Sequence, residues 1–206
     1  NVFISDATSR SIRKITKDGI IQKVLDETMV PMGEEFHPNS VMVDDAGTLY
    51  FSDAGSSRIA KIDIDGTFKI IGGTGEFKDD GDGSLAVSAG VRSPGGLLLG
   101  RDGSLYLAEE QTARIRKIDV QGIISLVAGT GVKGFSGDDG PAIQAQLKSP
   151  FRMVFDNSGN LIFTDRDNNR IRKIDTQGII FTLAGHGNFG WMQDGLEVKF
   201  TVQDFP

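Results

Sequence analysis

The chain has 206 residues, of which 38% are hydrophobic, and its formal net charge is −6. The negative charge argues against nucleic-acid binding, because such binding depends on a basic surface that neutralises phosphates. No apolar run approaches the roughly 18 residues of a membrane span, and the absence of cysteine excludes disulfides, thiol catalysis and cysteine-ligated zinc. We therefore expect a soluble protein without a membrane span.

One segment recurs four times along the chain. The copies run from Val2 to Gly19, Leu49 to Gly66, Leu105 to Gly122 and Leu161 to Gly178. Four prolines stand at regular intervals of 56 residues: Pro38, Pro94, Pro150 and Pro206. A period of this size is typical of propellers, solenoids and repeat arrays.

Each repeat predicts four strands, beginning with two that follow the proline. The first strands are short continuous apolar runs at 41–43, 97–99 and 153–155, the pattern of strands that are buried on both faces. A turn with glycine at its tip leads to the second strands at 49–52, 105–108 and 161–164. An acidic residue follows the second strand in every copy: Asp6, Asp53, Glu109 and Asp165.

The third and fourth strands complete a meander. The third carries the pattern Arg-Ile-x-Lys-Ile, and a glycine turn precedes the fourth strands at 20–25, 67–71, 123–128 and 179–184. Long connections rich in glycine and aspartate follow, and their Ala/Leu segments predict one helical turn each. The first connection, from Asp26 to His37, is nine residues shorter and lacks the Gly-x-Gly and Asp-Gly signals.

These residues resemble the NHL repeat. The resemblance rests on Asp165 with Arg170–Ile174, on the Leu-Ala-Gly-x-Gly run that starts at Leu183, and on Gly134–Ala142 with Leu147-x-x-Pro150. The long connection is similar to that of bacterial NHL-repeat proteins and of the teneurin-like propeller. The resemblance covers the whole chain and implies an all-β propeller of about six four-stranded blades around a central channel.

The chain supplies roughly four of those blades. We expect one propeller domain over 1–206, with a partial blade at 1–37, full repeats at 38–93, 94–149 and 150–205, and the start of another repeat at 206. An incomplete ring would leave apolar blade faces and strand edges in water. We therefore expect further blades from the same longer chain or from another subunit, with a closed ring of four blades as the alternative.

Residues that recur in every blade favour a structural role. We expect each acid after the second strand to accept hydrogen bonds from the backbone of the following loop. The Arg and Lys side chains of the third strand, at 13–14, 116–117 and 172–173, could form a basic stripe for RNA. Repetition favours aliphatic stems on the blade surface with heads that reach water or nearby acids.

Two metal sites are conceivable. Asp79, Asp80 and Asp82 place three carboxylates within four residues and could bind calcium, although solvated Asp-Gly turns are the favoured explanation. Enzymatic propellers of similar shape hold metals at the channel, and a metal-dependent hydrolase or lyase is therefore the alternative function. Only His37 and His186 are available as histidine ligands here, and they lie in non-equivalent connections.

Departures from the repeat mark candidate binding residues, because exposed aromatic and methionine side chains are favoured interface anchors. The candidates are Met32, Phe36, Glu109, Glu110, Phe189 and Trp191. For Trp191, packing onto the adjacent blade is the favoured interpretation. We expect a non-catalytic module that binds a protein or a glycan, needs no cofactor unless calcium is one, and belongs to an extracellular or cell-surface protein; RNA binding is the third candidate.

Overall fold

The computed structural model describes residues 1–30 and 36–187, and within these ranges it contains 16 strands and no α-helix. The strands form four antiparallel sheets, so the all-β prediction is confirmed. Among the same residues there is no helix long and apolar enough to cross a membrane.

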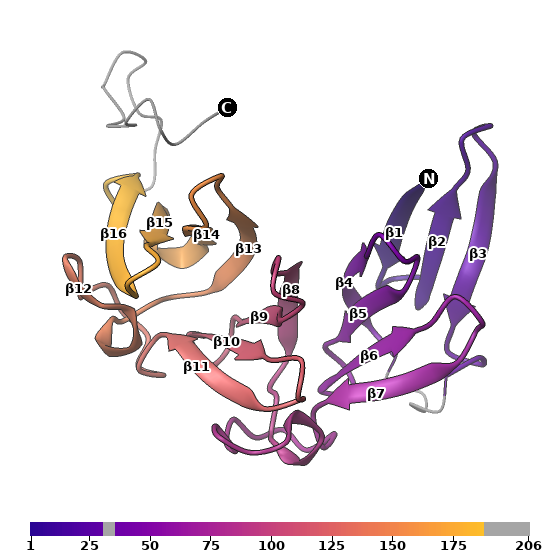
Figure 1. The fold of residues 1–206 in the computed structure, drawn as a ribbon, viewed down its shortest axis with the longest axis horizontal. Coiled ribbons are helices and arrows are strands. Elements are labelled where there is room, and N and C mark those ends of the chain that lie inside the picture. The colour runs from indigo at the N-terminus through magenta and orange to yellow at the C-terminus, as the bar shows by residue number, and fades with distance from the viewer. Residues whose placement is uncertain (31–35, 188–206) are drawn as a thin grey trace. The chain divides into compact units, whose positions relative to one another are not determined.

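The first two sheets are meanders in which neighbouring strands follow one another in the chain (Figure 1). The first contains β1 (Val2–Asp6), β2 (Ser11–Ile15) and β3 (Ile21–Asp26). The second contains β4 (Pro38–Val43), β5 (Leu49–Asp53), β6 (Arg58–Ile62) and β7 (Phe68–Gly72). The predicted meander is therefore present, and β4 starts at the proline rather than three residues later.

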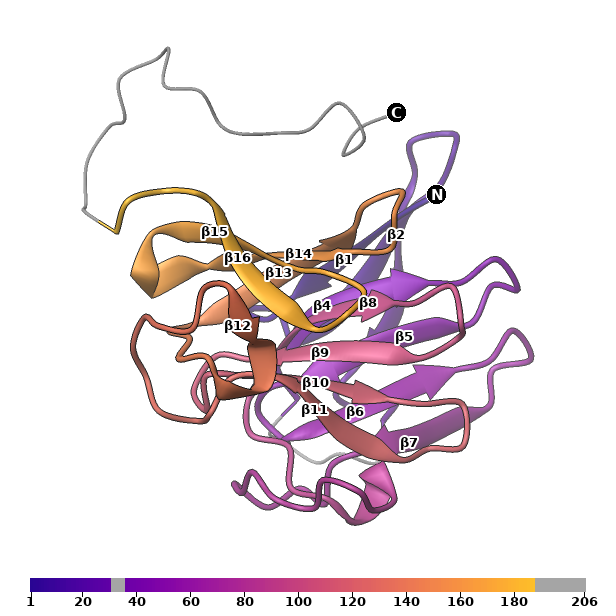
Figure 2. The ribbon, with the colours of Figure 1, turned by 60° about the vertical axis from the view of Figure 1, so that its left-hand side comes forward.

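The other two sheets repeat this order. The third contains β8 (Pro94–Leu99), β9 (Leu105–Glu109), β10 (Arg114–Ile118) and β11 (Ile124–Ala128). The fourth contains β13 (Pro150–Phe155), β14 (Leu161–Asp165), β15 (Arg170–Ile174) and β16 (Ile179–Ala184). A short fifth strand, β12 (Gly140–Pro141), pairs antiparallel with β16 (Figure 2). This extra strand comes from the connection that precedes the sheet.

The chain forms two compact units. The first consists of Asn1–Leu107 with Ile118–Ser125, and the second of Ala108–Lys117 with the chain from Leu126 onward. Two apolar clusters fill the first unit. One is made of Ile12, Leu25, Val30, Phe36, Leu49, Phe51 and Ala60. The other is made of Ile59, Ala86, Ala89, Val91, Leu97, Leu105, Leu107, Ile118 and Ile124. Each cluster thus contains side chains from more than one sheet, so the core of this unit lies between its sheets.

Serine hydroxyls join successive sheets in the first unit. Ser5, the penultimate residue of β1, donates to the Asn39 carbonyl at 2.9 Å. Ser52, the penultimate residue of β5, donates to the Gly95 carbonyl at 2.7 Å. Both acceptors directly follow the proline that opens a repeat. Equivalent serines of two repeats therefore form the same hydrogen bond from one sheet to the next.

One prediction about the first strand of the repeats is wrong for β13. A continuous apolar run predicted burial on both faces, but Val154 is 54% exposed and Arg152 is also exposed. These two residues lie on the same face of β13, because side chains alternate along a strand. In the described part of the chain, nothing packs closely enough over this face to bury Val154.

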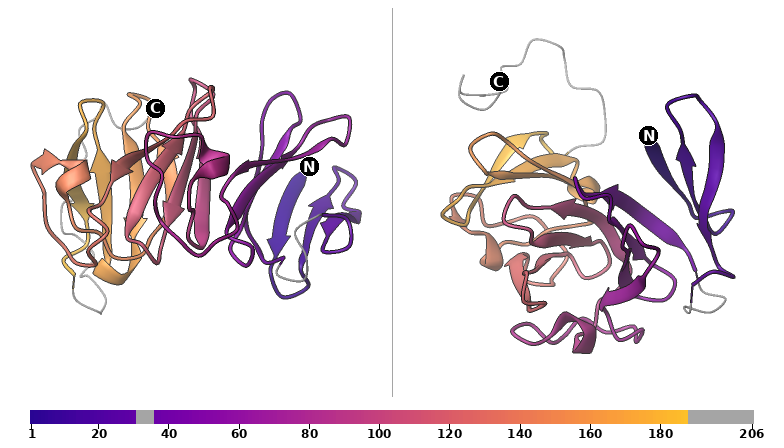
Figure 3. Two further views of the ribbon diagram at one scale, coloured as in Figure 1. Left: turned by 90° about the horizontal axis from the view of Figure 1, so that it is seen from below. Right: turned by 45° about the vertical axis from the view of Figure 1, so that its right-hand side comes forward.

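The long connections contain 3-10 turns, η2 (Ala86–Ser88) and η3 (Ala142–Gln144), so the predicted helical turn is confirmed. On one side the connection closes onto the preceding strand, where Gly73 N donates to the Ala86 carbonyl at 2.9 Å. On the other side it covers the outer strand of the next sheet, where Ala86 N donates to the Gly122 carbonyl at 2.8 Å. We call residues 83–86 and 139–142 the covering segments; their course can be followed in Figure 3.

We predict that Gly185→Ala destabilises the protein far more than Gly178→Ala. Both glycines have positive φ, 90° and 82°, which costs an alanine about 1 kcal/mol. A Cβ at Gly185 would also meet the Asn169 carbonyl oxygen, whereas one at Gly178 meets nothing within 4 Å. Urea unfolding should show a loss of roughly 3 kcal/mol or more for Gly185→Ala. Equal losses would contradict this packing of the connection.

Candidate functional site

The acid at the end of the second strand has the predicted structural role in two repeats. The Asp53 carboxylate accepts hydrogen bonds from Gly55 N at 3.1 Å and from the Ser56 hydroxyl at 2.6 Å. It also accepts one from His37 N at 2.7 Å, which ties the loop to the residue before Pro38. Asp6 accepts from Ser9 N at 3.0 Å.

Asp165 is held differently, and the prediction for this residue needs correction. Its carboxylate accepts from the Asn168 side-chain amide at 2.7 Å and from Lys148 N, in the preceding connection, at 2.7 Å. The reason is the turn η4 (Arg166–Asn168), which places the Asn168 side chain rather than loop backbone against the acid. Asp165 is fully buried, and this burial raises its pKa above the ordinary value despite these hydrogen bonds.

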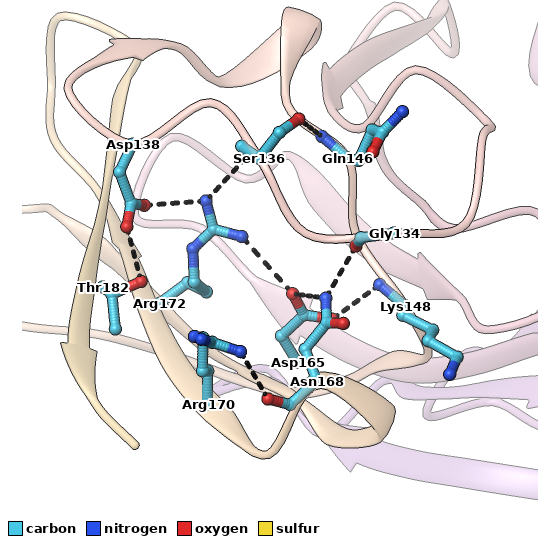
Figure 4. Close-up of polar contacts among 10 residues, drawn as sticks. All are labelled: Gly134, Ser136, Asp138, Gln146, Lys148, Asp165, Asn168, Arg170, Arg172 and Thr182. Carbon is cyan, nitrogen blue, oxygen red and sulfur yellow. Dashed lines mark hydrogen bonds and ion pairs between the residues drawn. The ribbon is translucent and has the colours of Figure 1, made fainter. Parts of the chain in front are cut away.

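Arg172 of β15 lies beside Asp165 and is itself fully buried (Figure 4). Its guanidinium donates to Asp138 at 2.8 Å and lies 3.4 Å from the Asp165 carboxylate. It also donates to the Ser136 carbonyl at 3.1 Å. The expectation that this side chain lies on the blade surface is therefore wrong, although a nearby acid is its partner as predicted. Arg172 joins the connection to the interior of the blade.

The other groups of this cluster are also occupied. Asp138 accepts a second hydrogen bond, at 2.7 Å, from the Thr182 hydroxyl of β16. The Phe135 ring lies under the Arg170 guanidinium at 3.6 Å from the ring centroid, and Arg172 approaches the same ring at 4.9 Å. Because the carboxylates and the terminal nitrogens of the Arg172 guanidinium are engaged with one another, the cluster stabilises the fold.

In the second sheet, apolar side chains fill the space that the buried arginine and its acidic partners fill in the fourth sheet. Ala60 occupies the position equivalent to Arg172, and it is fully buried. Phe36 and Phe51 fill the neighbouring space, with their ring centroids 5.9 Å apart and their planes at 85°. Phe36 is fully buried, so the prediction that it is an exposed interface anchor is wrong. The aromatic pair replaces the longer arginine side chain.

The two predicted glutamates lie in different environments. Glu109 is fully buried, with its carboxylate 3.6 Å from the Arg116 guanidinium, and is not available as a surface contact. Arg116 is fully buried as well, so the surface interpretation also fails for this arginine. Glu110 lies nearer the surface and accepts from Arg166 at 2.8 Å. Of the pair, only Glu110 keeps the predicted surface position.

The remaining candidates are tested little or not at all. Met32, Phe189 and Trp191 lie outside the described residues. Asp80 accepts a hydrogen bond from Gly90 N at 2.9 Å and so fixes its own connection. Within 1–30 and 36–187 there is no group of three or more His, Cys, Asp or Glu side chains placed to hold a metal ion. Calcium binding by Asp79, Asp80 and Asp82 stays a prediction.

Sequence reasoning missed a cleft of about 470 Å³ in the first unit. Residues of the second and third sheets, of the η2 connection and of the β8–β9 and β10–β11 turns line it. They are Tyr50, Lys61, Lys69, Ile70, Ile71, Leu85, Val87, Gly103, Leu105, Ile118, Asp119, Val120, Gln121 and Gly122. Three of its aliphatic side chains are well exposed: Leu85 at 50%, Val87 at 45% and Val120 at 65%. The sequence feature that could have indicated the cleft is Val120, an apolar residue in a turn.

Five polar or charged residues accompany the aliphatic lining: Tyr50, Lys61, Lys69, Asp119 and Gln121. Lys61 donates to Asp63 at 2.8 Å, and this hydrogen bond raises the pKa of the ammonium. The Tyr50 hydroxyl donates to Asp44 at 3.3 Å, and burial, more than the Asp44 charge, raises the pKa of the phenol. Both groups therefore keep their protons at neutral pH. An apolar cleft with a few fixed polar groups is the usual form of a recognition site.

Comparison with known proteins identifies the repeats. No family model matches the chain. It is 32% identical over 140 residues to Protein SUPPRESSOR OF QUENCHING 1, chloroplastic, of Arabidopsis thaliana, covering 64% of this chain and 13% of the relative. It is 27% identical to human Teneurin-1 over 204 residues, covering 90% and 7%. It is 30% identical to the bovine NHL repeat-containing protein 2 over 143 residues, covering 68% and 19%.

The chain is an NHL-type β-propeller sequence. Solved structures agree on the fold. A Bacteroides thetaiotaomicron protein of unknown function has a TM-score of 0.69 and 23% identity, covering 83% of this chain and 43% of that one. Virginiamycin B lyase from Staphylococcus aureus has a TM-score of 0.59 and 22% identity, covering 87% and 50%. The NHL-type chain thus spans a small part of its curated relatives.

Arg172→Met should lower the free energy of unfolding by about 3 to 5 kcal/mol, because it leaves the buried Asp165 without its cation. Arg170→Met is the matched control on the same strand. It removes a partly exposed guanidinium that stacks on Phe135, and should cost about 1 kcal/mol. Denaturant titration of the two variants decides the point. Similar losses would show that the buried cluster is not the stabilising element.

The Arg172→Met variant should also lose stability as pH rises from about 4 to 7. The pKa of Asp165 is already raised by burial, and loss of Arg172 raises it further. The folded state then holds the carboxyl proton more tightly than the unfolded state. The associated stability is fully present below the unfolded pKa and is lost as pH passes the folded pKa. The double variant Asp165→Asn/Arg172→Met should lack this decline; a parallel decline would refute the assignment.

Proposed function

We propose that this chain is a non-catalytic, protein-binding part of a larger NHL-type propeller protein, and that the cleft in its first unit contacts the partner. The exposed apolar lining of that cleft is the observation that carries the proposal. Exposed aliphatic groups gathered in a concave surface gain free energy when a partner covers them, at roughly 25 cal/mol per Å² of apolar area.

A protein partner fits this lining better than a glycan. A sugar presents hydroxyl groups over its whole edge, and each one needs a hydrogen-bonding partner when it is buried. Most of the cleft side chains are aliphatic, and Tyr50 is the one aromatic residue among those that line it. Aliphatic peptide side chains would bury the lining without leaving polar groups unpaired. Lys69 and Asp119 at the cleft could then select charged residues of the partner.

The test is selection of peptides from a random display library on the whole protein. Selected peptides should bind about tenfold or more weakly to Val120→Asp, since a charge in the apolar lining must be desolvated when the partner covers it. Ile64→Asp is the matched control. Ile64 is also an exposed aliphatic residue in the turn before a fourth strand, at 83% exposure, but it does not line the cleft.

Binding that survives in Ile64→Asp and is lost in Val120→Asp supports the proposal. Peptides that bind the wild type and both variants equally would place recognition on another surface. Failure to select any peptide above background would refute protein binding by this part of the chain.

A further inference from the structure

The outer strands of two sheets are covered by the chain itself. Ile124 of β11 exchanges backbone hydrogen bonds with the covering segment: its amide donates to the Ser84 carbonyl at 3.0 Å, and its carbonyl accepts from Gly83 N at 2.8 Å. In the second unit, the carbonyl of Ile180 in β16 accepts from Asp139 N at 2.9 Å. In both cases an alanine amide also donates to the carbonyl of the turn glycine, 2.8 Å away.

β7 is the corresponding outer strand of the second sheet, and Phe68 is the residue equivalent to Ile124 and Ile180. Asp63 N donates to the Thr67 carbonyl at 3.0 Å, so the next pair, Ile62 and Phe68, is a non-hydrogen-bonded pair. The Phe68 amide and carbonyl therefore point away from β6. The equivalent amide and carbonyl of Ile124 are the two groups through which β11 is covered.

Nothing within 1–30 and 36–187 pairs with this outer edge of β7. The connection that would supply a cover is nine residues shorter than the others and has no Gly-Asp-Gly sequence. Burial agrees with this difference. Ile124 and Ile180 are both 0% exposed, whereas Phe68 is only half-buried. Within 1–30 and 36–187 the outer edge of β7 is therefore open, whereas those of β11 and β16 are covered.

The uncovered edge is continuous with the cleft. Lys69, Ile70 and Ile71 of β7 line the cleft together with the exposed side chains of Leu85 and Val87. Lys69 is exposed and forms no ion pair among the described residues. A strand laid along β7 would therefore meet open backbone groups, an apolar surface and an unpaired cation.

We propose that β7 binds an extended, acidic peptide segment of a partner protein by antiparallel strand addition. The inference rests on the proposed protein-binding function and names the partner's chemistry. The covering segments supply the template: a glycine-containing run whose backbone exchanges two hydrogen bonds with the strand, followed by a small residue whose amide reaches the turn glycine, here Gly66. Lys69 favours an acidic residue in the added strand. An open strand edge is a ready template for pairing with another chain.

The probe is the synthetic peptide GDGSLAVS, the sequence that covers β11 in this chain. On binding, hydrogen exchange at the Phe68 amide of the whole protein should slow by about tenfold or more, while the Lys69 amide, which faces β6, stays unchanged. Lys69→Glu should weaken binding of this peptide, whereas Lys17→Glu, an exposed lysine in the turn before β3, should not. The peptide GKGSLAVS should bind the wild type more weakly.

A further variant separates strand addition from side-chain contact. Phe68→Pro removes the outward amide without breaking the ladder to β6, and should abolish binding. The Phe68 ring, which this variant removes, packs against Phe51 with the ring centroids 6.3 Å apart. An unfolding titration therefore checks that the variant still folds. The alternative variant keeps Phe68 and lengthens the first connection by nine residues that include the sequence Gly-Asp-Gly. The longer connection should cover β7 and exclude the peptide.

Two results would overturn the inference: a Phe68 amide that is already protected in the free protein, or peptide binding that persists in the extended-connection variant. The proposed function fails separately. Library peptides that require Val120 but leave the Phe68 amide unprotected would preserve the cleft as a binding surface and remove strand addition. Binding of GDGSLAVS at β7 that is unaffected by Val120→Asp would preserve strand addition and remove the cleft as the binding surface.

Discussion

Each of the two long connections that the structure describes in full forms backbone hydrogen bonds to two neighbouring segments at once, and the rest of the fold depends on this double attachment. Gly129 N donates to the Ala142 carbonyl at 3.0 Å, while Ala142 N donates to the Gly178 carbonyl at 2.8 Å, so one residue joins the end of β11 to the turn before β16. Each such bond contributes about 1 kcal/mol net, but together they orient the connection. Glycines are required where the chain turns back, because the Gly129 backbone has a φ of 94° and its α-carbon faces the Ala113 carbonyl.

Once the connection is fixed, the interior beneath it can be filled in two ways. In the second unit Arg172 reaches from β15 to Asp138 in the connection, and Asp165 and the Ser136 carbonyl complete its surroundings. In the second sheet Ala60 stands in its place, and the connection contributes the Phe36 ring. Exchange of buried ion pairs for apolar packing is often neutral in stability. What must change together is therefore the strand residue and its connection partner, which explains why the connection and the third strand depart from the repeat in the same copy.

The sequence predicted the fold well because periodicity and turn glycines act locally. Strands, meander order and the 3-10 turns followed from proline spacing, glycine tips and short apolar runs. Predictions failed where a side chain's environment is set by distant segments. Nothing near Arg172 in the sequence indicates that Asp138, 34 residues earlier, will bury it. Phe36 was misplaced for the same reason, since its burial depends on Phe51 across the sheet. The cleft could not be predicted, because it forms between segments as remote as Lys61 and Val120.

The deletion in the first connection links structure to function. In a repeat array, any residue that recurs in every copy has its role fixed by the common architecture, and new properties arise where one copy differs. The first connection is nine residues shorter than the others, and among the described residues no segment covers the outer edge of β7, which would ordinarily be a liability. This copy buries Phe36, and it has the exposed Lys69 on β7, whose outer edge is open in the part of the chain that the structure describes. A single charged side chain is a mild deterrent to self-association between identical edges, because two lysines would face each other. The same lysine attracts an acidic strand, so the side chain that disfavours pairing between identical edges also favours the proposed partner.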